Sequence, residues 1–257
     1  MTVHFIGAGP GAADLLTLRA VRLVGESQVC LYAGTYIGDE VLAHCPDGAQ
    51  LVDTQHLDLD AITEHCVRAH EAGHDVARLC SGDPSIYSAV AEQTRRLDRA
   101  GVPWDVTPGV PAYAAAAALI GRELTVPEVA QSVVLTRARR DSTQMPDTET
   151  LAHFASSRAT LVLHLAIRHT RELMATLVDD YGAGCPVVVV ANAEQPDQLV
   201  LRGTVADVAD QVEAAGLRQA AVILVGWALA ARDSDDFVES HLYGTRITRG
   251  ARNPQRS

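Results

Sequence analysis

Glycine loops that connect a strand to a helix recur along the first half of this chain. The apolar run 3–6 ends in Gly-Ala-Gly-Pro-Gly at 7–11, and later apolar runs end in Ser-Gly-Asp-Pro at 81–84 and in Pro-Gly at 108–109. A segment with helical spacing follows each loop, which predicts βαβ units and a largely parallel sheet. In a parallel sheet the three loops lie at one edge, where the ligands of open α/β sheets bind.

Glycine and proline also set the ends of the expected helices. A helix over 57–72 ends before Gly73, where a left-handed residue is favoured. Pro84 suits the first turn of a helix over 85–100, because proline lacks the N–H group that would be unpaired there. A third helix is expected over 112–120, in an alanine-rich stretch.

The second half repeats the alternation with one exception. The apolar runs 186–191 and 199–202 are separated only by 192–198, which is too short for a helical crossover and predicts an antiparallel hairpin. The expected fold class is therefore α/β, with two α/β domains. Their expected limits are an N-terminal domain with glycine-rich loops at 1–120, a linker at 121–131, a C-terminal domain at 132–245 and a tail at 246–257.

Composition excludes several classes of protein. The net charge of −11 and the aromatic content of 4% argue against a nucleic-acid ligand, which favours a basic surface and stacking rings. Apolar runs all fall well short of the ~20 residues that cross a membrane, and the N-terminus lacks the basic region of a secretory signal. We therefore expect a cytoplasmic protein without nucleic-acid or membrane partners.

The five cysteines do not indicate a metal site. They form no CxxC pair, and their odd number and bare spacing are typical of buried thiols in a reducing compartment. The neighbours His44-Cys45 and His65-Cys66 do not predict zinc either, since adjacent side chains rarely point at one ion. We expect no metal.

The first loop also matches a loose dinucleotide fingerprint, Gly7-x-Gly9-x-x-Ala12. A dinucleotide site further needs an acidic residue at the end of the second strand to hold the ribose. That strand ends in Tyr-Ala-Gly at 32–34, and Pro10 removes a backbone N–H that a pyrophosphate would use. A dinucleotide-binding α/β module and a loop without a ligand both remain open alternatives.

Only one acid, Asp83, accompanies the three loops at their shared edge. Glycine permits a ligand to approach the backbone, and no nucleophile–histidine pair accompanies these turns. Such a site suits the binding of a cationic or amphipathic ligand better than covalent hydrolysis. The alternative is that Asp83 is a structural turn residue.

Eight segments along the chain carry a resemblance to a known family. They are Phe-Ile-Gly-Ala-Gly-Pro-Gly (5–11), Leu-Tyr-Ala-Gly (31–34), Gly-Asp-Pro-Ser-Ile-Tyr (82–87), Thr-Pro-Gly-Val (107–110), Leu-Thr-Val-Pro-Glu-Val (124–129), Ser-Val-Val-Leu-Thr-Arg-Ala (132–138), Arg-Gly-Thr (202–204) and Ile-Leu-Val-Gly (223–226). In this order they resemble the tetrapyrrole (corrin/porphyrin) methyltransferase family over roughly residues 2–250. The chain has Ser88 where the family usually has glycine, and Arg139-Arg140 where an acid often stands.

This resemblance implies a function and a cofactor. Members of the family bind S-adenosylmethionine, with S-adenosylhomocysteine as product, in a cleft between two α/β domains of a homodimer. The 32–34, 124–128 and 135–138 segments are most similar to the members that methylate C11 of precorrin-4 in cobalamin biosynthesis. Methylation at another ring position, or of cobalt-precorrin-4, remains the alternative within the family.

The resemblance also implies site residues, carried over position by position. The expected cofactor residues are Pro10, Gly82, Asp83, Pro84, Ile86, Tyr87, Ala112, Tyr113, Leu165, Ala193, Ala220, Ala221 and Val222. Asp83 is the candidate catalytic residue, by orienting the cofactor or stabilising its positive charge. Because the precorrin-type substrate carries many carboxylates, arginine forks suit it, and Arg137 is the candidate, with Arg139 and Arg140 as further ones.

Overall fold

The computed structural model describes residues 1–138 and 144–233, and the predicted tail 246–257 lies outside them. The chain divides into two compact units. The first contains 1–120 together with 190–200 and 218–222, and the second contains the remaining described residues. The sequence had assigned 190–200 and 218–222 to the C-terminal domain, and the domain limits themselves stay a prediction.

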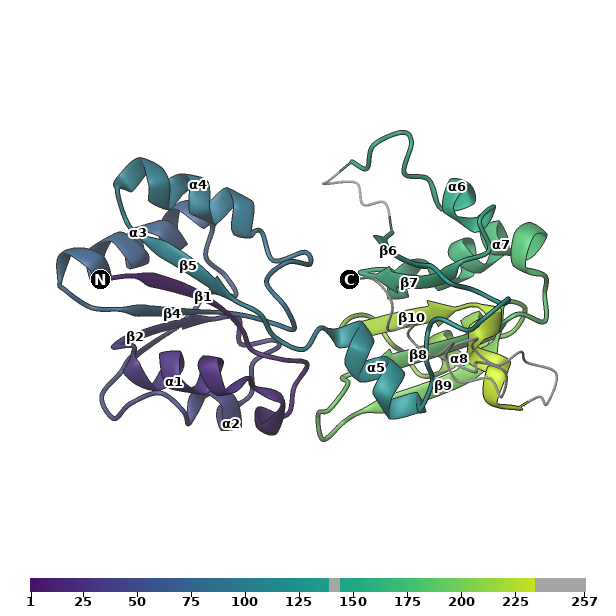
Figure 1. Ribbon diagram of the computed structural model, residues 1–257, viewed down its shortest axis with the longest axis horizontal. Helices are drawn as coiled ribbons and strands as arrows, with labels where there is room; N and C mark the ends of the chain where they lie inside the picture. Colours follow the sequence, from purple (N-terminus) through teal and green to yellow (C-terminus); the bar gives the residue numbers. More distant parts are fainter. Residues whose placement is uncertain (139–143, 234–257) are drawn as a thin grey trace, which may run out of the picture. The chain divides into compact units, whose positions relative to one another are not determined.

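The first unit is built on a parallel sheet with the strand order β3-β2-β4-β1-β5 (Figure 1). Its strands are β1 (Val3–Gly7), β2 (Val29–Tyr32), β3 (Gln50–Asp53), β4 (Val76–Cys80) and β5 (Trp104–Thr107). The expected parallel arrangement is confirmed. No range for β3 was predicted from the sequence, because this short edge strand is largely exposed and lacks an apolar run.

Helices cover both faces of this sheet (Figure 1). They are η1 (Ala13–Leu15), α1 (Leu18–Glu26), α2 (Asp39–Leu42), α3 (Leu59–Glu71) and α4 (Val90–Ala100), with α5 (Ala112–Ile120) after the last strand. Thr17 and Asp58 cap α1 and α3 through their side-chain oxygens, as N-cap residues do. One core packs α3 and α4 against Phe5 and Leu31, and a second packs α1 and α2 against Ile6 and Leu79.

The helix predicted over 85–100 begins later than expected. It starts at Val90, and residues 84–87 form a turn, so the prediction was wrong for its first turn. Tyr87 and Ala89 adopt left-handed backbone conformations with φ of 55° and 51°, which an α-helix cannot contain. Pro84 therefore belongs to the loop after β4 rather than to the helix.

The second sheet is mixed and has the strand order β6-β7-β10-β8-β9. Its strands are β6 (Val133–Arg137), β7 (Thr160–His164), β8 (Pro186–Ala191), β9 (Leu199–Thr204) and β10 (Ala221–Val225). Strand β7 pairs parallel to β6 and antiparallel to β10. Strands β8 and β9 are neighbours joined by 192–198, as a hairpin requires, and their antiparallel direction stays a prediction.

The helical elements of the second unit are α6 (Leu151–Ala155), η2 (Ile167–His169), α7 (Thr170–Tyr181), α8 (Val208–Ala214) and η3 (Trp227–Asp233). Leu177 of α7 is fully buried, as are Leu161 and Ile223 of the central strands. The Tyr181 hydroxyl donates a hydrogen bond to the carbonyl of Ala159 at 2.5 Å, which satisfies a polar group in this core. In the described ranges, no helix is long and apolar enough to cross a membrane.

Candidate cofactor-binding site

The three glycine loops meet at one edge of the first sheet, as predicted. Strand β1 lies between β4 and β5, with Gly7 opposite Cys80 and Ile6 opposite Thr107. Beyond the strand ends, the N–H of Gly82 donates to the carbonyl of Gly9 at 2.7 Å, and the N–H of Gly9 returns a bond to Gly82 at 3.2 Å. The first two loops are therefore joined directly through their backbones.

Close backbone packing explains why glycine occupies this edge. A Cβ atom on Gly7 would overlap the backbone nitrogen of Gly109 and would lie 2.9 Å from the carbonyl oxygen of Gly82. A Cβ atom on Gly109 would overlap that same Gly82 oxygen. The three glycines thus form a cradle of bare backbone, in which a side chain at Gly7 or Gly109 would force the loops apart, whereas a Cβ atom on Gly82 would have its nearest neighbours at 3.5 Å.

Asp83 ties the second loop to the third. One carboxylate oxygen accepts a hydrogen bond from the Gly109 N–H at 2.8 Å, and the other accepts from the N–H and hydroxyl of Ser85. Burial raises the pKa of the Asp83 carboxyl, but the hydrogen bonds from Ser85 and Gly109 outweigh it, so the net pKa lies below its ordinary value. Both oxygens hold the loops in place, which indicates a positioning role; the catalytic role of Asp83 stays a prediction.

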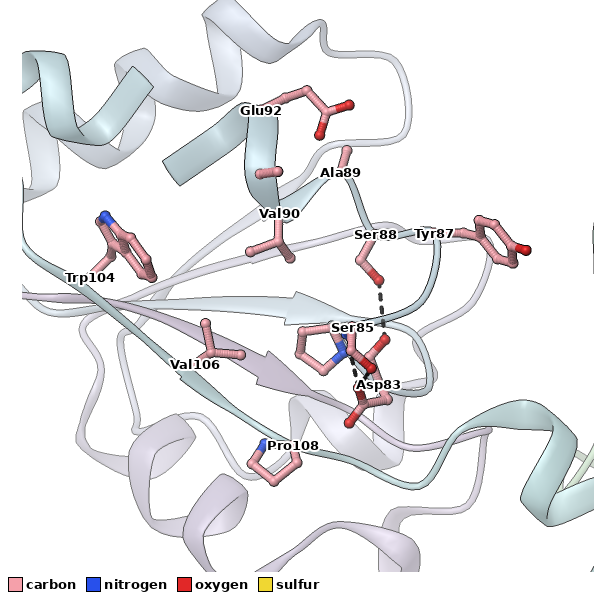
Figure 2. A pocket seen from close by; sticks show the side chains of 12 residues that line it. Asp83, Ser85, Tyr87, Ser88, Ala89, Val90, Glu92, Trp104, Val106 and Pro108 are labelled. Atoms are coloured by element: carbon pink, nitrogen blue, oxygen red, sulfur yellow. Dashed lines mark hydrogen bonds between the residues drawn. The ribbon is translucent and has the colours of Figure 1, made fainter. Parts of the chain in front are cut away.

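The loop that follows Asp83 lines an open pocket of about 940 Å³ (Figure 2). The pocket contacts Asp83, Pro84 and Tyr87 among the expected cofactor residues, and Trp104 and Val106 of β5 form another part of its wall. Tyr87 is 48% exposed, and its ring points away from the Trp104 end of the pocket (Figure 2). The pocket therefore includes only part of the expected cofactor set.

Part of the loop between β8 and β9 lies against the first glycine loop within the first unit. The side-chain amide of Gln195 donates to the carbonyl of Pro10 at 3.5 Å, and a Cβ atom on Gly11 would lie 2.8 Å from the carbonyl oxygen of Ala193. The N–H of Asn192 donates to the carbonyl of Ala220 at 2.9 Å. Three expected cofactor residues, Pro10, Ala193 and Ala220, are thereby brought together.

The third loop leads into α5, which carries two more of the expected residues. The backbone nitrogen of Ala112 lies 3.5 Å from the position that a Cβ atom on Gly82 would take. Ala112 and Tyr113, like Ile86, are half-buried in the described structure. Ala221 and Val222 begin β10 directly after Ala220.

Backbone strain marks several of these positions. Non-glycine residues with positive φ include Tyr87, Leu165 and Ala220, which are expected cofactor residues, and Ala89, Asn192 and Glu194, which lie within two residues of one. Such conformations cost of order 1–3 kcal/mol each and cluster at ligand sites. The strain supports the expected set as a functional site, and the assignment of each residue to the cofactor stays a prediction.

Leu165 and Arg137 belong to the second unit. Leu165 follows β7 and its side chain is 42% exposed. Arg137 ends β6 opposite His164, and its guanidinium donates to the carbonyl of Ala138 at 3.3 Å and to that of Gln144 at 3.4 Å. Burial lowers the pKa of the His164 imidazole to about 4, so it is neutral beside Arg137 at neutral pH. Arg139 and Arg140 lie outside the described residues.

Sequence reasoning missed Gly7, Gly11 and Gln195 as individual members of the site. Both glycines lie in a loop that the sequence analysis singled out. Why glycine is required at each position becomes clear only from the atoms that pack against it in the folded structure. No sequence motif pointed to Gln195, because its role arises from a contact between segments about 185 residues apart.

Comparisons with known proteins agree with this architecture. The model of the tetrapyrrole (corrin/porphyrin) methylases matches residues 2–209, and the chain belongs to this family. Within it, the chain is 56% identical to the precorrin-4 C(11)-methyltransferase of Rhodococcus erythropolis over 95% of this chain and 96% of that protein. It is 35% identical to the cobalt-precorrin-4 C(11)-methyltransferase of Priestia megaterium over the full length of both.

Solved structures of the same family share the fold. A cobalt precorrin-4 methyltransferase superposes with a TM-score of 0.86 at 35% identity, over 89% of this chain and 95% of that one. A uroporphyrin-III C-methyltransferase from Thermus thermophilus, complexed with S-adenosylhomocysteine, gives a TM-score of 0.75 at 27% identity, over 90% of this chain and 94% of that one. The predicted fold class of two α/β domains and the predicted family are both confirmed.

Proposed function

We propose that this chain is an S-adenosylmethionine-dependent methyltransferase that methylates C11 of precorrin-4 to give precorrin-5 in cobalamin biosynthesis. The observation that carries the proposal is the cradle of Gly7, Gly82 and Gly109, held closed by Asp83. The choice of precorrin-4 as substrate rests on relatives named precorrin-4 C(11)-methyltransferase, which are 48–56% identical over 95% of the chain.

The residues at the sheet edge fit this cofactor. Glycine at positions 7 and 109 lets the loops pack backbone against backbone, and the small side chains of Ala112, Ala193 and Ala220 suit a bulky nucleoside beside them. The residues that would hold the cofactor are the individual positions expected from the resemblance, of which Pro10 is the first and Val222 the last. When bound, S-adenosylmethionine supplies a methyl group already activated by its sulfonium.

Protein residues then contribute orientation rather than a strong nucleophile. Asp83 fixes the loops after β4 and β5 relative to each other, so the backbone groups of the site are in place before the cofactor binds. Correct alignment of reacting groups lowers a barrier by several kcal/mol. The exposed ring of Tyr87 offers a surface against which a planar ligand packs.

Arg137 is the residue we assign to the substrate. Arg137 is half-buried at the end of β6, and its guanidinium donates to the carbonyls of Ala138 and Gln144. A planar guanidinium binds carboxylates through paired hydrogen bonds, which suits the many carboxylates of a precorrin. We further propose that the protein is a cytoplasmic homodimer, as the family resemblance implies.

Two alternatives follow from particular observations. The Priestia megaterium relative is named for cobalt-precorrin-4, so the cobalt-containing substrate is the second candidate, ahead of methylation at another ring position. A dinucleotide-binding module is disfavoured, since β2 ends in Tyr32 and the neighbouring Asp53 carboxylate already accepts the N–H groups of Gly34 and Gln55.

Calorimetry and a transfer assay test the proposal together. The purified protein should bind S-adenosylhomocysteine and not NAD, and it should transfer a labelled methyl group from S-adenosylmethionine to precorrin-4 faster than to cobalt-precorrin-4. Binding of NAD in place of S-adenosylhomocysteine would support the dinucleotide module instead. Faster transfer to the cobalt-containing substrate would move the proposal to the second candidate.

A further inference from the structure

The loop between Asp83 and α4 adopts a conformation that its sequence alone does not favour. Tyr87 and Ala89 both have left-handed backbone angles, although neither is a glycine. The sequence favours continuing the helix back to Ser85, since Pro84 suits a first turn. Some tertiary interaction must therefore hold these residues out of the helix.

Gln93 makes that interaction from the first turns of α4. Its side chain is 3% exposed, and its amide nitrogen donates to the carbonyls of Ser88 at 3.3 Å and Ala89 at 3.2 Å. Its amide oxygen accepts from Nε of Arg78 at 3.0 Å. A single buried amide thus holds the two carbonyls beside the left-handed residues.

Arg78 anchors this amide to the sheet. It stands on β4, and its Nη1 donates to the carbonyls of Leu31 at 3.5 Å and Leu79 at 3.3 Å and to the hydroxyl of Thr54 at 3.4 Å. These acceptors lie on β2, on β4 and directly after β3. The guanidinium therefore has a fixed place relative to three strands.

We propose that Arg78 and Gln93 are positioning residues that hold Tyr87–Ala89 in its left-handed form and thereby keep the loop after β4 in the shape that binds the cofactor. This inference rests on the proposed function. The same loop carries Asp83, Pro84 and Tyr87, and the hydroxyl of Ser88 folds back onto the carbonyl of Asp83 at 3.3 Å. A displacement at Ala89 is therefore passed to the residues expected to touch the ligand.

A purely structural role would not require this pair. The surrounding layer is apolar, with Phe5 and Leu97 in the same core, and apolar residues of similar size fill such a layer at least as well as a polar pair. What an apolar replacement cannot do is bind the two loop carbonyls. This difference separates a role in the site from a role in the core.

The test replaces Gln93 with leucine, which keeps the volume and removes both hydrogen-bonding groups. We expect the Kd for S-adenosylhomocysteine, measured by calorimetry, and the KM for S-adenosylmethionine to rise about tenfold, equivalent to ~1.4 kcal/mol. The KM for the tetrapyrrole and kcat at saturating cofactor should stay within about twofold. Hydrogen exchange in a peptide covering 82–92 should accelerate.

Thr94→Val is the matched control, because Thr94 is the next buried polar residue of α4 and its hydroxyl bonds to Ala91 inside the same helix. It should leave the Kd for S-adenosylhomocysteine unchanged.

Adding Ala89→Gly to Gln93→Leu should restore part of the affinity for S-adenosylhomocysteine, since glycine adopts the left-handed form without the side-chain penalty.

Three results would overturn the inference. They are a folded Gln93→Leu protein whose Kd for S-adenosylhomocysteine stays within twofold of the unchanged chain, an equal rise in both KM values, and no recovery with Ala89→Gly. If Gln93→Leu does not fold, Gln93→Glu, which keeps an acceptor for Arg78 and removes the amide donor to Ser88 and Ala89, takes its place under the same criteria. Failure of the unchanged protein to bind S-adenosylhomocysteine would instead contradict the proposed function.

Discussion

The Asp83 carboxylate accepts a hydrogen bond from the backbone N–H of Gly109 at 2.8 Å, which links the loops after two strands that are not sheet neighbours. Strand β1 lies between them, and its Gly7 has no side chain to block the contact. The edge of the first sheet at which we expect the cofactor therefore has its loops after β4 and β5 joined by one carboxylate across bare backbone.

Replacing Asp83 with asparagine tests this arrangement. An amide keeps one acceptor but turns the other oxygen into a donor, so the bond to Gly109 or the bonds to Ser85 are lost. We expect the affinity for S-adenosylhomocysteine to fall about tenfold, because removing one partner of a charge-assisted bond costs ~1.5 kcal/mol or more. The melting temperature should change less than the affinity.

Asp53→Asn is the matched control for this variant. Asp53 also ends a strand of the first sheet and accepts two backbone N–H groups, from Gly34 and Gln55, but at a different strand. Both N–H groups bond to Oδ1 of Asp53, so asparagine keeps both bonds, and this variant should leave the melting temperature and the Kd for S-adenosylhomocysteine nearly unchanged. If Asp83→Asn lowers only the melting temperature, Asp83 is a structural turn residue.

Gly82→Ala separates strain from site geometry. Gly82 and Gly101 share a φ of +68°, so alanine at either position suffers a similar penalty of ~1 kcal/mol. Only Gly82 lies in the cradle, whereas a Cβ atom on Gly101 would meet no atom within 4 Å. Gly82→Ala and Gly101→Ala should unfold at similar urea concentrations, and only Gly82→Ala should weaken S-adenosylhomocysteine binding. The larger side chain of Gly82→Val should abolish this binding. Equal affinities in the two alanine variants would remove Gly82 from the site.

Arg137→Ala should affect the substrate rather than the cofactor. Losing a charge-assisted pair with a substrate carboxylate typically costs ~1.5–3 kcal/mol, which raises the KM for precorrin-4 about ten- to a hundredfold. The Kd for S-adenosylhomocysteine should stay the same. The control is Arg22→Ala, which removes an exposed arginine paired with Glu26 and should change neither the KM for precorrin-4 nor the Kd for S-adenosylhomocysteine. Equal losses for substrate and cofactor would assign Arg137 to the fold of the second unit.

His164 should make stability depend on pH in a defined window. Burial lowers its pKa to about 4 in the folded protein, against an ordinary value of 6.5. Between these values only the unfolded chain binds the proton, so this stabilising contribution is complete above pH 6.5 and is lost as the pH falls toward 4. From pH 7 to pH 5 the loss amounts to about 2 kcal/mol.

Urea unfolding of His164→Asn at these two pH values measures this contribution. The variant should lose about 2 kcal/mol less than the unchanged chain on acidification. His153→Gln, at an exposed position, serves as the control and should follow the unchanged chain. An identical pH dependence for His164→Asn and the unchanged chain would contradict burial of a neutral imidazole.

Much of the fold was predictable because strand and helix signals were local. The helix 112–120 and the strand 186–191 have the predicted bounds, and the shared edge of the three loops followed from parallel topology. The start of α4 was not predictable, because Gln93 and Arg78 override the local preference of Ser85–Ala89 through contacts that only the folded sheet provides. The contact of Gln195 with Pro10 was hidden for the same reason.

The position of the transferred methyl group tests the central proposal most directly. The protein is incubated with precorrin-4 and S-adenosylmethionine carrying a ¹³C-labelled methyl group, and the product is examined by NMR. The proposal predicts one new labelled methyl group, bound to C11 of the macrocycle. A label at another ring carbon, or no transfer by a protein that binds S-adenosylhomocysteine, would contradict the proposed function.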